Sequence, residues 1–437
     1  MQATEPRDPA EPDALSAPGP EAVRRARLAV LACFLIQGAS FAVLVTRVPA
    51  IQDRYHLGDG ALTIVLSLVP IVAGVGSLLA EKLAARYGSH HVLRTAQPVV
   101  CASVLGVGAG DAVWQLASVL VVFALALGAV DATMNMQAIG IQARQGRSVM
   151  NGFHAAWSLG GIAGAGLATF ADHKDVALVV MYALSAAITA PAALLIGRHY
   201  LPTATTTETA TATQPETAAA TAPKTAAATA NESGSAAKPT PTLPWRTILP
   251  LCAVMAFVYI GDSAVSSWGA VYAEKAQDMD DNTALPYLVY MVTALLGRGL
   301  GDLGVRRWGA LPVVRAGALT AAVGFAAVVA APSPAVALAG FTVLGLGISV
   351  LVPQTFAAGA ETSPDDRDTA IARLNLFNYA GFLIGTPLVG VVGDLAGFRA
   401  AMAVPLVLVL AILPLARAFA PQGEAGHGIG RRTGSGR

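Results

Sequence analysis

Twelve separate apolar runs, each long enough to cross a lipid bilayer, constrain the fold of this chain more than any other feature. A helix needs about 20 consecutive apolar residues to cross the hydrocarbon core of a bilayer. The runs cover residues 28–47, 60–81, 94–110, 113–138, 153–171, 175–197, 248–272, 284–304, 311–331, 335–357, 370–393 and 398–419. We therefore predict an all-α membrane protein with twelve transmembrane helices, six on each side of a long polar segment.

The composition excludes a soluble protein of this size. Of the 437 residues, 54% are hydrophobic and only 13% are charged, whereas about 25% of the residues of a soluble domain are charged. The net charge of +1 indicates no nucleic-acid partner, and the three cysteines are too widely spaced to predict a disulfide framework or a metal site. We expect no metal and no cofactor, and the surplus apolar surface must face the lipid bilayer.

Polar segments divide the chain into domains. Residues 1–26 contain acids and prolines but no apolar run, so they do not resemble a cleavable signal peptide and are expected to form a disordered N-terminal tail. Residues 201–246 consist mostly of Ala, Thr, Pro, Glu and Ser, which is typical of a flexible linker. We expect six-helix bundles at 27–200 and 247–420 and a disordered tail at 421–437.

The basic residues predict the orientation of the chain in the membrane. If both termini and the linker are cytoplasmic, 23 of the 28 lysines and arginines lie on the inner side. An excess of Lys and Arg on the cytoplasmic side is the rule for membrane proteins. We therefore expect a multi-pass protein of the cell (inner) membrane. The five outer residues are Arg47, Arg54, Lys174, Lys275 and Arg399.

The two predicted bundles repeat the same residues at a constant spacing of 221 (302 − 81 = 221). Such an offset across separate helices indicates a duplicated six-helix unit, and hence two pseudo-symmetric bundles. In transporters built this way the substrate site lies between the halves near the midplane of the membrane. The matched pairs are Glu81 and Asp302, Arg86 and Arg307, Gly88 and Gly309, Gly160 and Gly381, and Gly164 and Gly385.

Two acids, Asp131 and Asp262, lie at the depth of the predicted membrane. A charge costs about 2.5–3.5 kcal/mol at the centre of a membrane helix, so each acid needs a reason to be there. Asp131 shares one helical face with Gly128 and Asn135. Both acids are candidates for a carboxyl group that binds and releases a proton as the site faces each side in turn. The alternatives are an ion pair for Asp131 and a hydrogen bond between helices for Asp262.

Amide and aromatic side chains at similar depth form a second group of candidates. An amide both donates and accepts hydrogen bonds, which suits a neutral, hydroxyl-rich solute but also suits contacts between helices. An aromatic ring can stack on a sugar or pack against a neighbouring helix. The candidate substrate-binding residues are Asn135, Gln37, Tyr259, Trp268, Gln354, Asn375 and Asn378.

Charged clusters follow the second and eighth spans. A salt-bridged cluster at this position can hold neighbouring helices together on the cytoplasmic side and release them when the halves move; the alternative is simple anchoring by basic residues. The residues of these gating candidates are Glu81, Arg86, Arg298, Asp302, Arg306 and Arg307.

The sequence resembles the major facilitator superfamily, and within it the fucose-permease-like branch of sugar/proton symporters. Glu81 with Arg86-Tyr87-Gly88 is similar to the superfamily's loop between helices 2 and 3, although Ser77 and Arg298 stand where Gly is usual. Asp131-Ala-Thr-Met-Asn135 resembles the branch's helix 4 motif, with Asp in place of Glu. The resemblance implies a proton-titrating carboxylate at Asp131 and a sugar-binding amide at Asn135.

The resemblance departs at the first helix, where the branch carries a second acid shortly before a proline. Here Arg47 precedes Pro49, so the resemblance does not extend to fucose or to the full proton relay. Uncharacterised bacterial members with Arg-x-Pro-x-Ile after helix 1 and an acid followed by Trp in helix 7 are more similar, as in Arg47 to Ile51 and in Asp262 with Trp268.

These features predict a secondary active transporter, with protons and a small molecule as partners. We expect a monomeric symporter that moves a small polar solute, such as a sugar, by proton-coupled alternating access. The alternative is proton-antiport efflux of drugs or metabolites, which requires an aromatic-lined apolar cavity, and only 6% of the residues are aromatic. A membrane sensor or an enzyme is disfavoured because no soluble domain or protease motif is visible, and the lack of a phosphate-binding loop disfavours ATP-driven primary transport.

Overall fold

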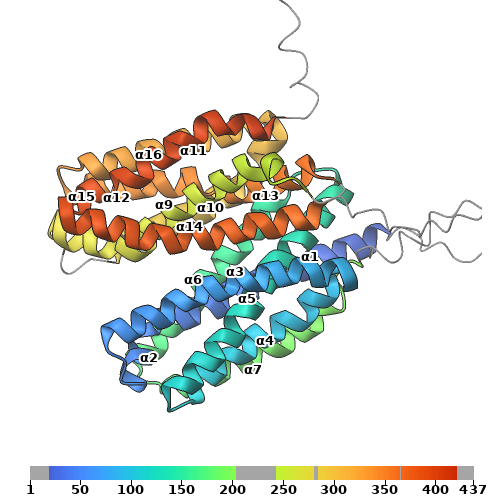
Figure 1. Ribbon diagram of the computed structural model, residues 1–437, viewed down its shortest axis with the longest axis horizontal. Coiled ribbons are helices and arrows are strands. Elements are labelled where there is room, and N and C mark those ends of the chain that lie inside the picture. Colours follow the sequence, from blue (N-terminus) through green and yellow to red (C-terminus); the bar gives the residue numbers. More distant parts are fainter. Residues whose placement is uncertain (1–18, 203–242, 280–283, 365, 421–437) are drawn as a thin grey trace, which may run out of the picture.

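The computed structural model describes residues 19–202, 243–279, 284–364 and 366–420, and its long helices form two bundles (Figure 1). The first bundle contains α1 (Pro20–Thr46), α2 (Val48–Arg54), α3 (Asp59–Tyr87), α4 (Ser89–Ala109), α5 (Val113–Gln145), α6 (Met150–His173) and α7 (Leu178–Gly197). The second contains α9 (Trp245–Gln277), α10 (Leu285–Trp308), α11 (Ala310–Ala330), α12 (Pro334–Ile348), α13 (Leu351–Thr362), α14 (Arg367–Ala396), α15 (Phe398–Ala401), α16 (Ala403–Leu415) and the 3-10 helix η2 (Ala416–Phe419).

The all-α, twelve-helix prediction is confirmed. Within the described residues, α12 continues into α13 as one span, and α15, α16 and η2 form another. Eleven helical segments of the described chain are long and apolar enough to cross a membrane. The remaining predicted span, 153–171, corresponds to α6, which is less apolar because it contains several glycines and His154.

Close packing compensates for the modest apolar character of α6. A Cβ atom added at Gly160 would collide with the backbone of Leu35 in α1, and one at Gly164 would collide with Ala39. Small residues let helix backbones approach closely inside membranes, where van der Waals contact drives association. The position of α6 is therefore set by its contact with α1.

The duplication predicted from the sequence is present in the helix bounds. α11 begins and ends 221 residues after α4 (310 − 89 = 221). Gly88 and Gly309 both have a φ of 83°, and each N–H donates at 2.8 Å to the carbonyl oxygen four residues earlier. Glycine adopts positive φ without steric cost. The same turn therefore links α3 to α4 and α10 to α11.

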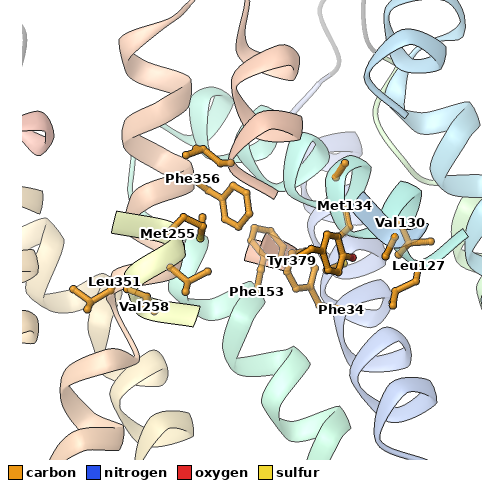
Figure 2. Close-up of a cluster of buried hydrophobic side chains, with 14 of the residues drawn as sticks. Phe34, Leu127, Val130, Met134, Phe153, Met255, Val258, Leu351, Phe356 and Tyr379 are labelled. Atoms are coloured by element: carbon orange, nitrogen blue, oxygen red, sulfur yellow. The ribbon is translucent and has the colours of Figure 1, made fainter. Parts of the chain in front are cut away.

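The two bundles meet through buried hydrophobic side chains (Figure 2). Phe34 and Phe153 from the first bundle belong to the same core cluster as Met255 and Phe356 from the second. Tyr379 of α14 extends from the second bundle toward α5 of the first. The core is therefore continuous across the interface between the halves.

One end of the molecule, which we call the basic end, carries the turns at Gly88 and Gly309 and the arginines beside them. The opposite end carries α2 and an ion pair between Arg47, the residue that follows α1, and Asp172 of α6. Within the described chain, the hydrogen bonds that join the two bundles lie between the midplane and the basic end.

The predicted start of the first span differs from the structure. α1 begins at Pro20, about two turns earlier than predicted, because Gly19-Pro20-Glu21 places a proline in the first turn and an acid beside the helix N-terminus. Its first turns carry arginines and extend the helix beyond the apolar run. Residues 1–18, 203–242 and 421–437 of the predicted tails and linker lie outside the described residues.

Candidate functional site

Asp131 lies in the middle of α5 and accepts hydrogen bonds from two other helices. Gln37 Nε2 of α1 lies 3.4 Å from its Oδ1, and Tyr379 Oη of α14 lies 2.5 Å from its Oδ2. The two ion pairs found among the described residues, Arg25–Glu21 and Arg47–Asp172, do not involve it. Asp131 is therefore held by neutral donors, one of which belongs to the other half.

A chain of polar side chains fixes the orientation of Gln37. Gln97 Nε2 of α4 donates to Gln37 Oε1 at 3.4 Å, and the thiol of Cys33 donates to Gln97 Oε1 at 3.3 Å. Gln37 and Gln97 are almost completely buried. Because the Gln37 carbonyl is already used as an acceptor, its amide N–H group points to Asp131.

Asn135 lies one helical turn from Asp131, as predicted from the spacing. Its Nδ2 donates to the backbone oxygen of Asp131 at 2.8 Å. Its Oδ1 is buried and has no hydrogen-bond partner among the described residues. One buried acceptor beside the carboxylate is thus left for a solute group.

Asn375 and Asn378 connect α14 to α3. Asn375 Nδ2 donates to the Ser77 hydroxyl at 3.3 Å, and Asn378 Nδ2 donates to Asn375 Oδ1 at 3.4 Å. The Ser77 hydroxyl donates to the Ala372 carbonyl at 3.2 Å. In this conformation the two amides hold the halves together.

Asp262 of α9 lines a small cavity of about 60 Å³. Tyr290 of α10 donates a hydrogen bond to its Oδ1. The cavity lies mainly in the second bundle, and Trp157 of α6 contributes a wall from the first. Its chemistry is set by four aromatic and two charged residues, Trp157, Tyr259, Tyr287, Tyr290, Asp262 and Arg298.

Arg298 lies in this cavity. It is one helical turn deeper than Asp302, the nearest of the loop charges with which it was grouped from the sequence. Its Nη1 donates to the Ser158 hydroxyl of α6, whereas its Nε is buried without a hydrogen-bond partner in the described chain. The structure therefore corrects its assignment to a cytoplasmic charge cluster: the guanidinium spans the two halves within the cavity.

Tyr259 lies between the two acids. It lines the Asp262 cavity and also interacts electrostatically with Asp131. Gln354 of α13 is 2% exposed, and its Nε2 has no partner among the described residues. Both residues remain candidates for contact with a solute.

Trp268 lies outside the cavity. Its Nε1 donates to the carbonyl oxygen of Thr386 at 2.8 Å, and its ring packs against Phe398 with centroids 5.4 Å apart. The structure thus places Trp268 in the contact of α9 with α14 and α15 and does not bring it to the other candidates.

Asp302 caps the start of α6. Its carboxylate accepts hydrogen bonds from Ser148 Oγ at 2.7 Å, Asn151 Nδ2 at 3.0 Å and the backbone N–H groups of Asn151 and Gly152 at 3.2 and 3.0 Å. The first N–H groups of a helix lack intrahelical partners and favour negative charge. Asp302 therefore joins α10 to α6 across the halves.

The predicted salt-bridged clusters do not form as ion pairs within the described chain. Arg306 Nε donates to the backbone oxygen of Asp302 at 3.0 Å. Arg86 and Arg307 instead lie over the neighbouring rings of Tyr87 and Trp308, at 5.3 and 5.6 Å from their centroids.

Glu81 does not repeat the role of its counterpart Asp302, because the helices that they face begin differently. The position that matches Met150, the start of α6, is Ile371 (371 − 150 = 221), but α14 begins four residues earlier at Arg367. The N–H groups that Glu81 would cap are thus inside a helix and already bonded.

Sequence reasoning missed three residues that contact the candidate residues from other helices. Tyr379 and Tyr290 both donate to carboxylates, and Ser158 accepts from Arg298. One signal was available: Tyr379 lies four residues after Asn375, on the same face of α14 as the candidate amides.

Metal chemistry has no site in the described part of the chain. No group of three or more His, Cys, Asp or Glu side chains there could hold a metal ion. What the site offers is hydrogen bonding, two carboxyl groups, a guanidinium and aromatic rings.

Comparisons with known proteins agree with this architecture. The chain matches the family model of the Major Facilitator Superfamily over residues 29–310 and 282–435. An uncharacterised MFS-type transporter of Yersinia pestis is 27% identical over 391 residues, which cover 88% of this chain and 93% of the relative.

Solved structures share the fold. FucP in the outward conformation superposes with a TM-score of 0.72 at 18% identity, over 91% of this chain and 99% of FucP; FucP is a fucose:proton symporter of E. coli. The human organic anion transporter MFSD10 superposes with a TM-score of 0.69 at 13% identity, over 91% of this chain and 100% of MFSD10. The chain therefore belongs to the Major Facilitator Superfamily and is a multi-pass membrane transporter of the secondary type.

Proposed function

We propose that the protein moves a small polar solute by proton-coupled alternating access and that Asp131 carries the proton. The observation that supports this most is the position of its carboxylate, which lies at depth in one half and accepts a hydrogen bond from Tyr379 of the other. When a carboxyl group in this position binds a proton, its charge and the strength of its hydrogen bond to the opposite half change together.

Protonation of Asp131 has two physical consequences. An ionised carboxylate accepts hydrogen bonds about twice as strongly as a neutral acceptor, so the contact with Tyr379 is strongest when Asp131 is charged. A neutral carboxyl is also cheaper to keep among apolar side chains. Proton binding therefore weakens one contact between the halves and lowers the cost of moving the site across the membrane.

The orientation is part of the same proposal. We place the basic end in the cytoplasm, with both termini there and the protein working as a monomer in the cell membrane, because basic residues favour the inner side. The hydrogen bonds between the halves then lie on the cytoplasmic side, and the conformation is open to the outside. The likeness to FucP in its outward conformation supports this placement.

A sugar is one solute class that the geometry supports. The free Asn135 Oδ1 and Gln354 Nε2 offer one acceptor and one donor. FucP, whose fold is similar, is a fucose:proton symporter.

Proton-antiport efflux is a second candidate, and one observation favours it. Aromatic rings form much of the wall of the Asp262 cavity, and MFSD10, of similar fold, is an organic anion transporter. Expression in a drug-sensitive host distinguishes the two directions: efflux predicts resistance to toxic compounds, and uptake predicts none.

The central experiment uses purified protein in liposomes. A panel of sugars, nucleosides, amino acids and drugs is first scored by thermal stabilisation, and the best solute is then offered with an imposed proton gradient. We expect Asp131→Asn to abolish proton-driven accumulation but to retain exchange of labelled for unlabelled solute. Asp394→Asn, which alters an exposed acid of α14, serves as the matched control. Undiminished accumulation by Asp131→Asn would contradict the proposal.

A further inference from the structure

Two opposite charges, Asp262 and Arg298, line the same cavity without forming an ion pair. Asp262 accepts a hydrogen bond from the Tyr290 hydroxyl, and Arg298 donates one to the Ser158 hydroxyl. The ion pairs among the described residues lie elsewhere, at Arg25–Glu21 and Arg47–Asp172. Each charge in the cavity is therefore held by a neutral partner.

This arrangement is unusual for charges at this depth. Ionised side chains inside membrane proteins normally pair with one another or mark the path of a substrate. Arg298 also keeps a buried Nε–H without a hydrogen-bond partner among the described residues. A buried donor left unpaired is destabilising, and more so when the group is charged. Arg298 acts on Asp262 only at a distance, so neither charge touches a counterion, and a bound solute would supply one to each.

The aromatic walls of the cavity indicate which charged group of a solute would lie beside Asp262. Trp157, Tyr259, Tyr287 and Tyr290 surround the space beside Asp262. The face of an aromatic ring attracts a cation, most strongly where the contact is shielded from water. An ammonium group would therefore find a carboxylate and several ring faces together, while a carboxylate would find the guanidinium of Arg298.

We propose that the transported solute is a small zwitterion, with its ammonium group at Asp262 and its carboxylate at Arg298. This inference rests on the proposed transport function and narrows it to a substrate class. A neutral sugar would leave both charges without a counterion in contact, and a solute with a single charge would leave one of them so. The small volume of the cavity, about 60 Å³, favours a compact solute.

Binding of the carboxylate also connects the cavity to the interface between the halves. Arg298 belongs to α10 and at present donates to Ser158 of α6. A solute carboxylate forms a charge-assisted hydrogen bond, which is stronger than a bond to a neutral hydroxyl. Occupation of the cavity therefore draws Arg298 away from Ser158 and loosens a contact that joins the bundles.

The test compares four compact solutes by thermal stabilisation of the purified full-length protein at neutral pH. 4-Aminobutyrate is the zwitterion, butyrate the anion, butylamine the cation and fucose the neutral sugar; glycine, serine and threonine are added as further zwitterions. We expect stabilisation by at least one zwitterion and by none of the other three. Stabilisation by fucose alone, by a singly charged solute alone, or by no zwitterion at millimolar concentration overturns the proposal.

Variants connect the binding to the two charges. Arg298→Gln and Asp262→Asn should each weaken zwitterion binding about 30-fold or more, as expected when one partner of a buried charge pair is removed. Arg298→Gln should also shift the preference from the zwitterion to butylamine, which a merely misfolded cavity would not do. Arg298→Lys keeps the charge and should retain part of the affinity. The exposed residues Arg315 and Asp394 provide the matched controls Arg315→Gln and Asp394→Asn.

Failure of this inference is distinguishable from failure of the proposed function. If fucose binds and accumulates under a proton gradient, the zwitterion proposal is wrong and proton-coupled transport stands. If a zwitterion binds at Asp262 and Arg298 but is not transported, the assignment of the binding site stands and the transport proposal is wrong. Equal binding of a zwitterion by wild type, Arg298→Gln and Asp262→Asn overturns the assignment of the site.

Discussion

Equivalent positions in the two repeats carry different kinds of side chain. In the first bundle Gln37 and Asp131 form a hydrogen bond between α1 and α5. The positions 221 residues later are Val258 and Val352 (258 − 37 = 221; 352 − 131 = 221), and both line the cavity in the second bundle. The acid of that bundle is instead Asp262, one turn further along α9.

The difference suggests a division of labour between the two bundles. The Asp131 side consists of amides and a tyrosine, which suit a proton that is bound and released without a counterion. The Asp262 side offers aromatic rings and an arginine around a cavity, which suit a solute. A duplicated scaffold thus supports two unlike sites because the scaffold is set by glycine contacts and turns, whereas the sites depend on a few side chains.

The largest expected effect separates the two acids by counterflow, in which labelled solute exchanges without net proton movement. Asp262→Asn should reduce counterflow to background at solute concentrations near the wild-type Kd, because it removes the partner of the solute ammonium group. Asp131→Asn should leave counterflow largely intact, because only the coupling to protons is lost. Equal loss of counterflow in both variants would contradict the assignment of solute binding to Asp262 and proton coupling to Asp131.

The second prediction tests whether the scaffold is equivalent in the two repeats. Gly160→Ala and Gly381→Ala should each destabilise the protein by about 1–3 kcal/mol, the usual cost of overpacking, because a Cβ would collide with the backbone of Leu35 or Ala256. Gly166→Ala is the control, since a Cβ there meets nothing within 4 Å. Melting temperatures that fall for only one of the first two variants would show that the repeats differ in packing as well.

The third prediction concerns the tyrosines that donate to the acids. A hydrogen bond to a charged group contributes about 1.5–3 kcal/mol, which corresponds to roughly tenfold or more. Tyr379→Phe should therefore lower proton-driven accumulation about tenfold or more and leave solute affinity unchanged. Tyr290→Phe should weaken binding by a similar factor and leave the accumulation ratio at saturating solute unchanged. Calorimetry and uptake on the same preparations give both values, and a reversed pattern would exchange the roles of the two sites.

The smallest expected effect concerns the basic end. Asp302→Ala removes the cap of α6 and should cost about 0.5–2 kcal/mol, seen as faster hydrogen–deuterium exchange at the N–H groups of Asn151 and Gly152. Glu81→Ala should leave exchange at the start of α14 unchanged, because Glu81 has no free N–H groups to cap there. Equal acceleration at both helices would contradict the asymmetry between the repeats.

Much of the fold could be predicted from the sequence because membrane spans depend on local composition. The spans, the duplication and the family resemblance all follow from apolar runs, repeated glycines and short motifs. The early start of α1 was missed because Pro20 and Glu21 direct a helix start that lies outside the apolar run.

The candidate site was predicted only in part, because its contacts join helices far apart in the chain. Asp131 and Tyr379 are 248 residues apart, and no helical periodicity indicates which faces meet across the two bundles. Arg298 was grouped with the loop charges by proximity in sequence, whereas one helical turn separates it from Asp302 and brings it into the cavity. Trp268 shares the helix of Asp262, but its indole lies against α14.

Direct recording of proton movement tests the central claim most closely. Liposomes containing the protein, with no imposed gradient, receive the solute that stabilises it best, and a pH electrode follows the external medium. Wild type and Asp394→Asn should alkalinise the medium as solute enters, whereas Asp131→Asn should admit solute with no change in pH. Solute-dependent alkalinisation by Asp131→Asn equal to that of wild type would contradict the role of Asp131.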